Sequence, residues 1–234
     1  MRYNQNNNSW KNICEICQML TVDFEEFVSK RKKFKKTIDK NLQTICDYVY
    51  FRFIDDNRAI LCGSADDIDN EKTVQFSNVR LQKLLFLFYG LYFTYVNKEL
   101  FDAQFEAWKN GPVIRSIYAY FHECRNFLHA YRYIPFCFDE NSFLNENNFK
   151  DELDKFIANH DNQLSKISKQ IVEQKIDIQT IDKIYKRFNF LETFMLVNAI
   201  HKMAIYRDYF IPGQLGCKIP KDELLKFFDN ELLK

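Results

Sequence analysis

Residues 77–93, SNVRLQKLLFLFYGLYF, form the segment that most restricts how this chain can fold. Ser77 is a typical N-cap residue, because its hydroxyl can accept a hydrogen bond from an unpaired backbone amide of the first helical turn. A helix that is apolar on all sides is typical of the centre of a protein. The sequence therefore predicts that the other elements pack around residues 77–93. Its apolar side chains occupy both the i, i+3, i+4, i+7 face and the opposite face: Leu81, Leu84, Leu85, Phe86, Leu87, Phe88, Tyr89 and Leu91.

Glycine and proline are scarce, with 5 and 4 residues among 234. Large β-sandwiches and doubly wound nucleotide-binding folds usually need more glycine for turns, and neither G-x-G-x-x-G nor a P-loop pattern occurs. We therefore predict a mainly α, compact multi-helix domain with at most a small β element and an N-terminal helical extension. Apolar residues recur at helical spacing in residues 10–29, 42–54, 112–128, 149–175, 178–188, 191–206 and 221–233.

For some of these segments the sequence allows a more detailed prediction. Residues 42–54 favour a helix, and the alternative is a strand, because YVYFRFI is rich in β-forming residues. We interpret residues 149–175 as one long polar helix with a narrow apolar seam. We expect Asn189 to cap the helix of residues 191–206, and Pro220 to open the last helix.

A short element precedes the helix of residues 112–128. Apolar and polar residues alternate over residues 101–108, which predicts a short strand or an extended segment. Asn110-Gly111 indicates a turn, and we expect Pro112 to occupy the first position of the following helix. With Trp108, this pattern favours a structural corner, in which glycine lets the chain approach the indole closely. The alternative is a partner-binding groove, because tryptophan is enriched at binding hot spots.

Charge is balanced overall, with 33 basic and 32 acidic residues, so a nucleic-acid partner would have to bind a local surface. The basic run of residues 30–36 is such a candidate for phosphate contacts, although a solvated helix face is the favoured reading. No stretch is apolar enough to span a membrane, and MRYNQNNNSW lacks the apolar core of a secretory signal. We therefore expect a cytoplasmic protein with no membrane partner. The candidate phosphate-binding residues are Lys30, Arg31, Lys32, Lys33, Lys35 and Lys36.

We expect no metal site and no cofactor. The 7 cysteines are scattered, and the single C-x-x-C pair, Cys14 and Cys17, has no second pair to complete four zinc ligands. Residues 62–73 form an acidic segment with alternating carboxylates. They lack the glycine and the distal glutamate of an EF-hand loop, so we interpret them as a solvated loop.

Two stretches together resemble a known family. RLQKLLFLFYG at residues 80–90 and LFDAQFEAWKNGPVIRSIYAYF at residues 100–121 are similar to the core signature of the Panacea domain. That family is also described as SocA-like or phage-associated GepA-like. Matches at many positions with fixed spacing make the resemblance specific. The matching residues are Leu81, Gln82, Lys83, Leu84, Leu85, Gly90, Leu100, Phe101, Glu106, Ala107, Trp108, Gly111, Pro112, Val113 and Tyr118.

The later part of the chain resembles the family less closely. IDKIYKRFNFLETFMLVNAIHK at residues 181–202 is similar to the penultimate helices, where His201 matches a family histidine and Ile200 replaces the preceding threonine. The family's following Pro-Trp is absent, and MAIYRDYF stands in its place. The resemblance covers residues 42–234 with a helical insertion near 139–176. Residues 1–41 form an extension outside it.

The resemblance implies a mainly helical cytosolic domain without established catalytic residues or cofactors. Members of the family resemble antitoxins that neutralise toxins by direct binding, and one branch delivers its toxin to a AAA+ protease. Many are encoded on prophages and other mobile elements. We therefore expect a non-enzymatic antitoxin of a toxin–antitoxin system, with a toxin as its protein partner. The candidate partner-binding residues are Gln82, Lys83, Trp108, Gly111, Pro112 and His201.

Two other functions stay open at this stage. The first is a counter-defence inhibitor, comparable to an anti-CRISPR protein, that is encoded on a mobile element and docks on a host nucleoprotein complex through the basic run. The second is a hydrolase that uses His201 as a general base. A single histidine in an apolar helix is more often a core residue, and the sequence offers no paired nucleophile for it.

Overall fold

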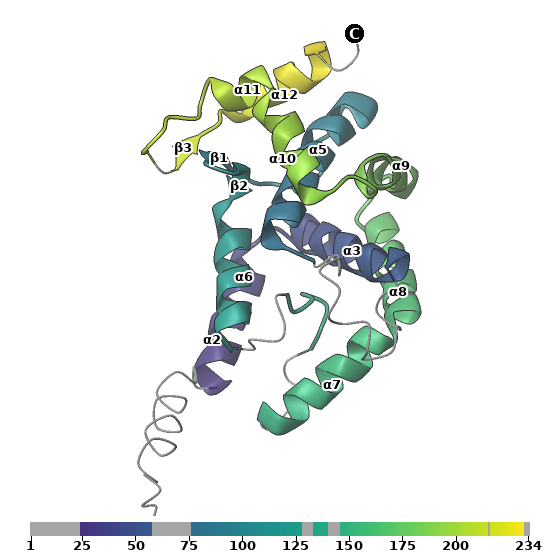
Figure 1. The fold of residues 1–234 in the computed structure, drawn as a ribbon. Coiled ribbons are helices and arrows are strands. Elements are labelled where there is room, and N and C mark those ends of the chain that lie inside the picture. Colours follow the sequence, from purple (N-terminus) through teal and green to yellow (C-terminus); the bar gives the residue numbers. More distant parts are fainter. Residues whose placement is uncertain (1–23, 58–75, 128–132, 140–145, 215, 232–234) are drawn as a thin grey trace, which may run out of the picture.

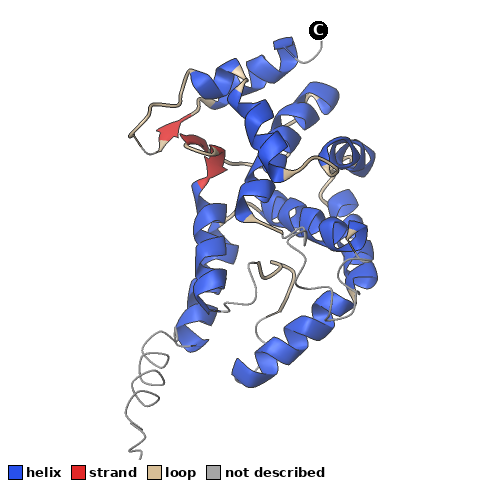
Figure 2. Cartoon of the chain, in the orientation of Figure 1, coloured by secondary structure: helices blue, strands red, loops and turns tan. Residues whose placement is uncertain are grey.

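The structure of the protein is a computed structural model that describes residues 24–57, 76–127, 133–139, 146–214 and 216–231 (Figure 1). Helices dominate, and the strands among these residues form one small antiparallel sheet in the order β2-β1-β3 (Figure 2). The predicted mainly α fold with a small β element is confirmed. In chain order the elements are α2 Phe24–Thr37, α3 Lys40–Asp56, α5 Asn78–Val96, β1 Phe105–Trp108, β2 Gly111–Ile114, α6 Arg115–Phe127, α7 Glu146–Ala158, α8 His160–Glu173, α9 Ile178–Phe188, α10 Thr193–His201, α11 Ala204–Arg207, β3 Cys217–Lys218 and α12 Lys221–Glu231.

Helix α5 lies at the centre of the fold, as its apolar sequence predicts (Figure 1). Oγ of Ser77 accepts a hydrogen bond from the backbone nitrogen of Arg80 at 3.1 Å, so the predicted N-cap is present. Every residue from Arg80 to Tyr92 is buried. The helix contacts α3, α6, α9, α10, α12 and β2. Most of the molecule is therefore organised around one apolar helix.

Gly90 lets the last helix approach α5 closely. A β-carbon at this position would lie 2.1 Å from Cδ2 of Phe228 on α12, closer than any two carbons pack. Phe228 is fully buried and also contacts the ring of Phe86 at 5.3 Å between centroids. The absence of a side chain at Gly90 therefore makes room for the aromatic contact between α5 and α12.

Residues 42–54 are helical, which confirms the helix and excludes the strand. Oδ1 of Asp39 caps α3 by accepting a hydrogen bond from the backbone nitrogen of Leu42 at 3.0 Å. The buried carboxylate of Asp47 accepts bonds from the Tyr133 hydroxyl at 2.6 Å and from the backbone nitrogens of Phe136 and Cys137 at 2.8 and 2.7 Å. One side chain of α3 thus fixes the irregular segment 133–138 against the core.

The prediction of one long helix over residues 149–175 is wrong. The chain forms α7 and α8, which are separate helices joined at Asn159. The break changes the helix direction (Figure 1). Buried Phe149 of α7 can then contact the ring of Phe27, while buried Ile167 and Ile171 lie on α8, which packs along α3. A straight helix would not place both halves of the seam against the core.

The prediction for residues 189–206 also needs correction. Asn189 ends α9, and its Nδ2 donates to Oδ2 of Asp56 at 2.8 Å. Glu192, not Asn189, is the N-cap residue of α10. The apolar stretch is divided into α10 and the short α11 at Lys202–Met203. Asn189 has a long-range partner on α3, so local sequence alone did not reveal its role.

Other expectations lie outside the described residues. These are most of the helix over residues 10–29, the Cys14–Cys17 pair and the acidic segment 62–73. The last helix begins after Pro220, as predicted. Within the described parts of the chain, no helix has the length and apolar character needed to cross a membrane.

Candidate functional site at the β-hairpin

The segment that contains Trp108, Gly111 and Pro112 is a β-hairpin. Strands β1 and β2 are antiparallel, and Trp108 pairs with Gly111 across a two-residue turn. The prediction that Pro112 opens a helix is wrong, because Pro112 lies in β2 opposite Ala107 and α6 begins at Arg115. Strand β2 is at the edge of the sheet, where a residue without an N–H group is tolerated. The corner is therefore a hairpin followed directly by a helix.

Gln82 holds the open edge of this hairpin. Its Oε1 accepts from the backbone nitrogen of Ile114 at 2.8 Å, and its Nε2 donates to the carbonyl of Ile114 at 3.3 Å. The amide thus satisfies both backbone groups of one β2 residue, as a neighbouring strand would. The Gln82 side chain is buried, and its hydrogen bonds attach α5 to the sheet.

Lys83 is the next residue along α5 and is only 1% exposed. Its Nζ donates to the carbonyl of Pro112 at 2.8 Å. Removal from water lowers the pKa of the Lys83 amine to about 7. Gly111 has a left-handed φ of 99°, and a β-carbon there would lie 2.8 Å from this Nζ. Glycine is therefore needed both for the turn and for the approach of the lysine.

Trp108 belongs to a charged cluster on the outer side of the hairpin. Its Nε1 donates to Oε2 of Glu106 at 2.9 Å, and Glu106 accepts two further bonds from Nε and Nη2 of Arg115 at 2.9 and 2.7 Å. The indole also contacts Tyr118 and the Arg115 guanidinium, at 4.9 and 5.6 Å from the ring centroid. Burial would raise the pKa of Glu106, but bonds from Arg115 and Trp108 and the charge of Arg115 keep it below its usual value.

His201 reaches the hairpin from α10. Its ring stacks on Tyr206 with centroids 4.7 Å apart, and the Tyr206 hydroxyl donates to the carbonyl of Trp108 at 2.9 Å. Nε2 of His201 is buried and has no hydrogen-bond partner among the described residues. Burial, together with the nearby charge of Lys83, lowers the pKa of His201. The imidazole is thus favoured in its neutral form, as an aromatic packing group.

The fold brings together the six residues that we considered as partner contacts. Four of them are buried, and Trp108 and His201 are partly exposed. A partner could contact the buried four only after the hairpin had separated from α5. Sequence reasoning missed Arg115 and Tyr206 as members of this cluster. Glu106 could have been noticed, because it shares one face of β1 with Trp108, two residues on. The four buried residues are Gln82, Lys83, Gly111 and Pro112.

The cluster has the side chains of a catalytic site but not its geometry. A neutral lysine can act as a nucleophile or base when a substrate reaches it. Here the Lys83 amine is enclosed by the chain at Gly111 and Pro112, and among the described residues His201 has no carboxylate bonded to it. The bonds connect α5, the hairpin and α11. The arrangement can therefore stabilise the fold. This agrees with the interpretation of Trp108, Gly111 and Pro112 as a structural corner.

One cavity lies beside the hairpin, with a volume of about 440 Å³. Its lining includes Glu106 and Arg115, which bind each other, and Lys221, which pairs with Glu99 at 2.5 Å and Asp102 at 3.5 Å. These charges neutralise one another, so the cavity has no strong preference for an anion or a cation.

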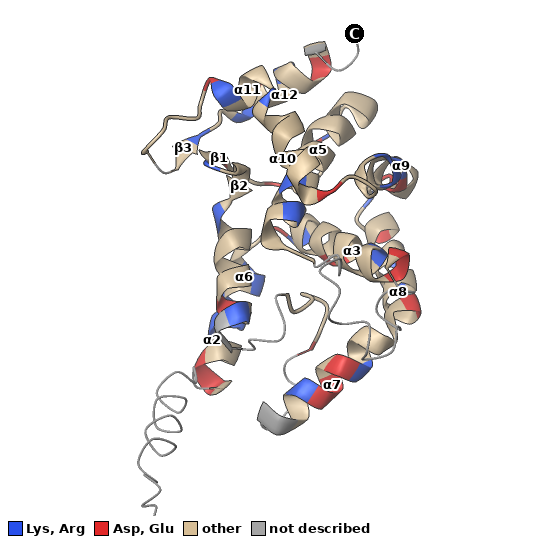
Figure 3. Ribbon diagram, in the orientation of Figure 1, with Lys and Arg blue, Asp and Glu red and all other residues tan. Residues whose placement is uncertain are grey.

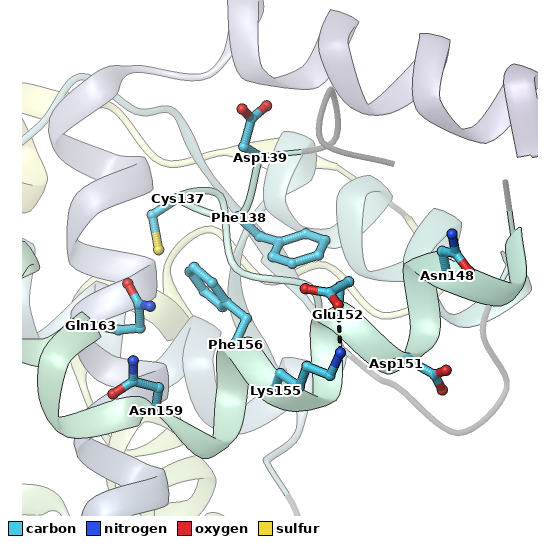
Figure 4. Close-up of a pocket in the computed structure, with 10 residues that line it drawn as sticks. All are labelled: Cys137, Phe138, Asp139, Asn148, Asp151, Glu152, Lys155, Phe156, Asn159 and Gln163. Carbon is cyan, nitrogen blue, oxygen red and sulfur yellow. Dashed lines mark hydrogen bonds and ion pairs between the residues drawn. The ribbon is translucent and has the colours of Figure 1, made fainter. Parts of the chain in front are cut away.

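A larger cavity of about 720 Å³ lies in the predicted insertion, between α7, the start of α8 and residues 137–139 (Figure 4). The rings of Phe138 and Phe156 lie 5.0 Å apart in it, and Lys155 pairs with Glu152 at 2.6 Å. Elsewhere, Asp55, His160 and Asp161 place ligand-type atoms within 4.8 Å of one another. Exposed acidic groups commonly gather in this way without an ion, so neither place defines a catalytic or metal centre.

The basic run lies on α2, and its residues have different roles. Arg31 is 1% exposed, and it donates from Nε to the Tyr120 hydroxyl at 3.1 Å and from Nη2 to the Pro135 carbonyl at 2.5 Å. Arg31 therefore anchors α2 in the interior. Because it is buried, its guanidinium is not accessible to a phosphate, in contrast to the candidate role that the basic run suggested. Lys30 pairs with Glu26 and Glu123, at 3.0 and 3.3 Å. Lys35 is partly buried, while Lys32, Lys33 and Lys36 are exposed.

Comparison with known proteins agrees with this architecture. The sequence model of the family described as "Antitoxin SocA-like, Panacea domain" matches residues 81–204, from the buried face of α5 to the beginning of α11. The match includes the hairpin and every residue of the cluster around Lys83 except Tyr206. The chain therefore belongs to the SocA-like Panacea-domain family, which confirms the resemblance. Searches of curated proteins and of solved structures found no match.

Proposed function

We propose that this protein is an antitoxin that neutralises a protein toxin by binding it directly, without making or breaking a covalent bond. The observation that carries the proposal is membership of the SocA-like Panacea family, whose match spans the centre of the fold. The internal bonding of the hairpin cluster supports a scaffold role for the most characteristic family residues. Binding would then use exposed side chains rather than the buried residues of that cluster.

The proposal is tested by co-expressing this chain with each protein encoded next to its gene that arrests growth when it is produced alone. We expect the chain to restore growth and to form a complex of fixed stoichiometry with that protein in size-exclusion chromatography with light scattering. The toxin level, measured over time after protein synthesis is stopped, distinguishes sequestration of the toxin from its degradation. A stable toxin indicates sequestration, and loss that depends on a AAA+ protease indicates delivery for degradation. Growth arrest that persists at equal expression would refute the antitoxin role.

A second candidate is an inhibitor that docks on a host nucleoprotein complex. The observation that favours it is the group of exposed lysines on α2, Lys32, Lys33 and Lys36. Reversing these three charges would weaken such docking and its dependence on salt. Unchanged inhibition by the triple variant would exclude this surface. Arg31 is left unchanged in this experiment because it supports the fold.

A further inference from the structure

Helix α10 presents apolar side chains to solvent as well as to the core. Leu196 and Ile200 face inward and are buried. On the outward side, Phe194 and Met195 are 71% and 52% exposed, and Phe190 in the preceding connection is 74% exposed. The outward side of a surface helix is normally polar. A group of large exposed apolar side chains usually marks a binding surface. We call Phe190, Phe194 and Met195 the α10 face.

The start of this face is held rigidly by a buried arginine of α5. Nη1 of Arg80 donates to the carbonyl of Leu191 at 2.7 Å, and Nη2 donates to the carbonyl of Asn189. These two bonds fix the backbone on both sides of Phe190. A fixed backbone removes part of the conformational entropy that an exposed aromatic residue loses when a partner covers it. Phe190 is therefore an exposed aromatic residue on a backbone that is fixed in place.

Most exposed charges near the α10 face in the chain are positive, while Asp56 of α3, an exposed carboxylate, binds Asn189 directly before Phe190. Between Ile178 and Lys202, the exposed charged side chains are four cations and one carboxylate. Helices α9 and α10 are consecutive and both contact α5; in Figure 3, α10 is mostly tan and α9 carries basic residues together with an acidic one. The carboxylate is Glu192, and the cations are Lys183, Lys186, Arg187 and Lys202.

The cations of α9 are only partly neutralised by the protein itself. Lys186 pairs with Asp182 at 2.6 Å. Lys183 and Arg187 contact the aromatic ring and hydroxyl of Tyr95 rather than carboxylates, within the part of the chain that the structure describes. These two cations can therefore pair with acidic groups of a partner at the edge of an apolar contact.

We propose that the α10 face, together with Lys183 and Arg187 on the helix that precedes it in the chain, is the docking site for an acidic amphipathic segment of a protein partner. Apolar side chains of that segment cover Phe190 and Phe194, and its carboxylates pair with the α9 cations. A second copy of this chain is disfavoured as the occupant, because a two-fold contact would bring basic surfaces together. The inference rests on the proposed function only in identifying the toxin as the carrier of this segment.

Two synthetic peptides test the site with the full-length chain. Both are amphipathic 18-residue helices with the same leucine and phenylalanine positions, one with glutamate and the other with lysine on the polar face. We expect the glutamate peptide to bind at least about tenfold more tightly in fluorescence anisotropy at low salt. The double variant Lys183→Glu/Arg187→Glu should reverse this preference. The matched control, Lys32→Glu/Lys36→Glu on α2, should retain it.

The apolar part of the contact is tested separately. Phe190→Ser/Phe194→Ser should weaken the glutamate peptide about 30-fold, the size of effect typical of aromatic hot spots. Val172→Ser, which alters an apolar side chain 58% exposed on α8, should have no such effect. Circular dichroism melting of each variant checks folding. Equal binding of the two peptides, or equal effects of site and control variants, would overturn the inference.

Two further measurements separate the alternatives. A wild-type dimer in analytical ultracentrifugation that Phe190→Ser/Phe194→Ser dissociates would assign the face to a second copy and overturn the docking proposal. Peptide selectivity without toxin neutralisation would overturn the proposed antitoxin function alone. Neutralisation that the Phe190→Ser/Phe194→Ser variant leaves intact would overturn the α10 face alone.

Discussion

At the scale of single residues, Lys83 is in the most unusual environment of the described chain. It lies in the first turns of an otherwise apolar helix, is almost fully buried and donates one hydrogen bond to the carbonyl of Pro112. Neither that carbonyl nor Gly111 carries a charge that would stabilise an ammonium group. The amine is therefore tolerated because it fastens α5 to the hairpin and can lose its proton near pH 7.

The first prediction concerns the pH dependence of stability. Between about pH 7 and the usual lysine pKa of about 10.4, the unfolded chain holds a proton on Lys83 that the folded chain has lost, so stability rises with pH. From pH 7 to 8.5 this group should add about 1.5 kcal/mol. Lys83→Met should lose this increase in urea unfolding, and of the other titrating groups only His201, whose pKa the charge of Lys83 lowers, should change with it. Parallel pH profiles would contradict a buried neutral amine.

The second prediction concerns Gly111. Gly111→Ala combines a left-handed backbone with a contact of 2.8 Å to the Lys83 amine, and we expect it to cost about 3 kcal/mol in urea unfolding. Gly213→Ala is the matched control, because Gly213 also has a positive φ, of 83°, but nothing lies within 4 Å of the added carbon. It should cost about 1 kcal/mol. Equal losses would mean that the lysine moves aside without cost.

At the scale of elements, long-range side-chain bonds connect segments whose sequences look independent. Arg31 joins α2 to α6 and to the segment 133–138, and Asp47 joins α3 to the same segment. In Figure 1, α2 and α6 lie side by side at the edge of the molecule. A basic run on a helix therefore serves two purposes here, because one arginine turns inward while three lysines remain in solvent.

The third prediction separates these two purposes. Arg31→Met removes the two hydrogen bonds that Arg31 donates to the Tyr120 hydroxyl and the Pro135 carbonyl. This substitution should lower the free energy of unfolding by about 3 kcal/mol. Lys32→Met, one position along the same helix and exposed, should stay within about 0.5 kcal/mol of the parent. Chemical denaturation followed by circular dichroism measures both. A similar, small effect of the two substitutions would argue against the anchoring role of Arg31.

At the scale of the whole molecule, an almost neutral net charge conceals an uneven surface. The chain has a formal charge of +1, yet the exposed charges of α9 and α10 are mainly positive and border apolar side chains. A protein that acts by binding needs such a local surface more than it needs a net charge. The α10 face is exposed, whereas the residues of the hairpin cluster are mostly buried.

Much of the architecture could be predicted because it depends on local periodicity. The apolar helix of residues 77–93, its Ser77 cap and the helix of residues 42–54 follow from side-chain spacing and capping, which do not require knowledge of distant residues. The same is true of the Panacea signature, whose positions lie at fixed spacing. The errors at Asn159, Asn189 and Pro112 occurred where an element ends, and there distant packing partners decide the boundary.

The sequence by itself determined that α5 is buried, that the protein is mainly helical and that it belongs to the Panacea family. Tertiary structure alone decided that Gln82, Lys83 and Arg31 turn inward, and that Phe190 and Phe194 turn outward. The physical reason is that the direction of a side chain depends on bonds to residues far away in sequence. Lys83 binds Pro112, and Arg80 fixes the backbone on either side of Phe190.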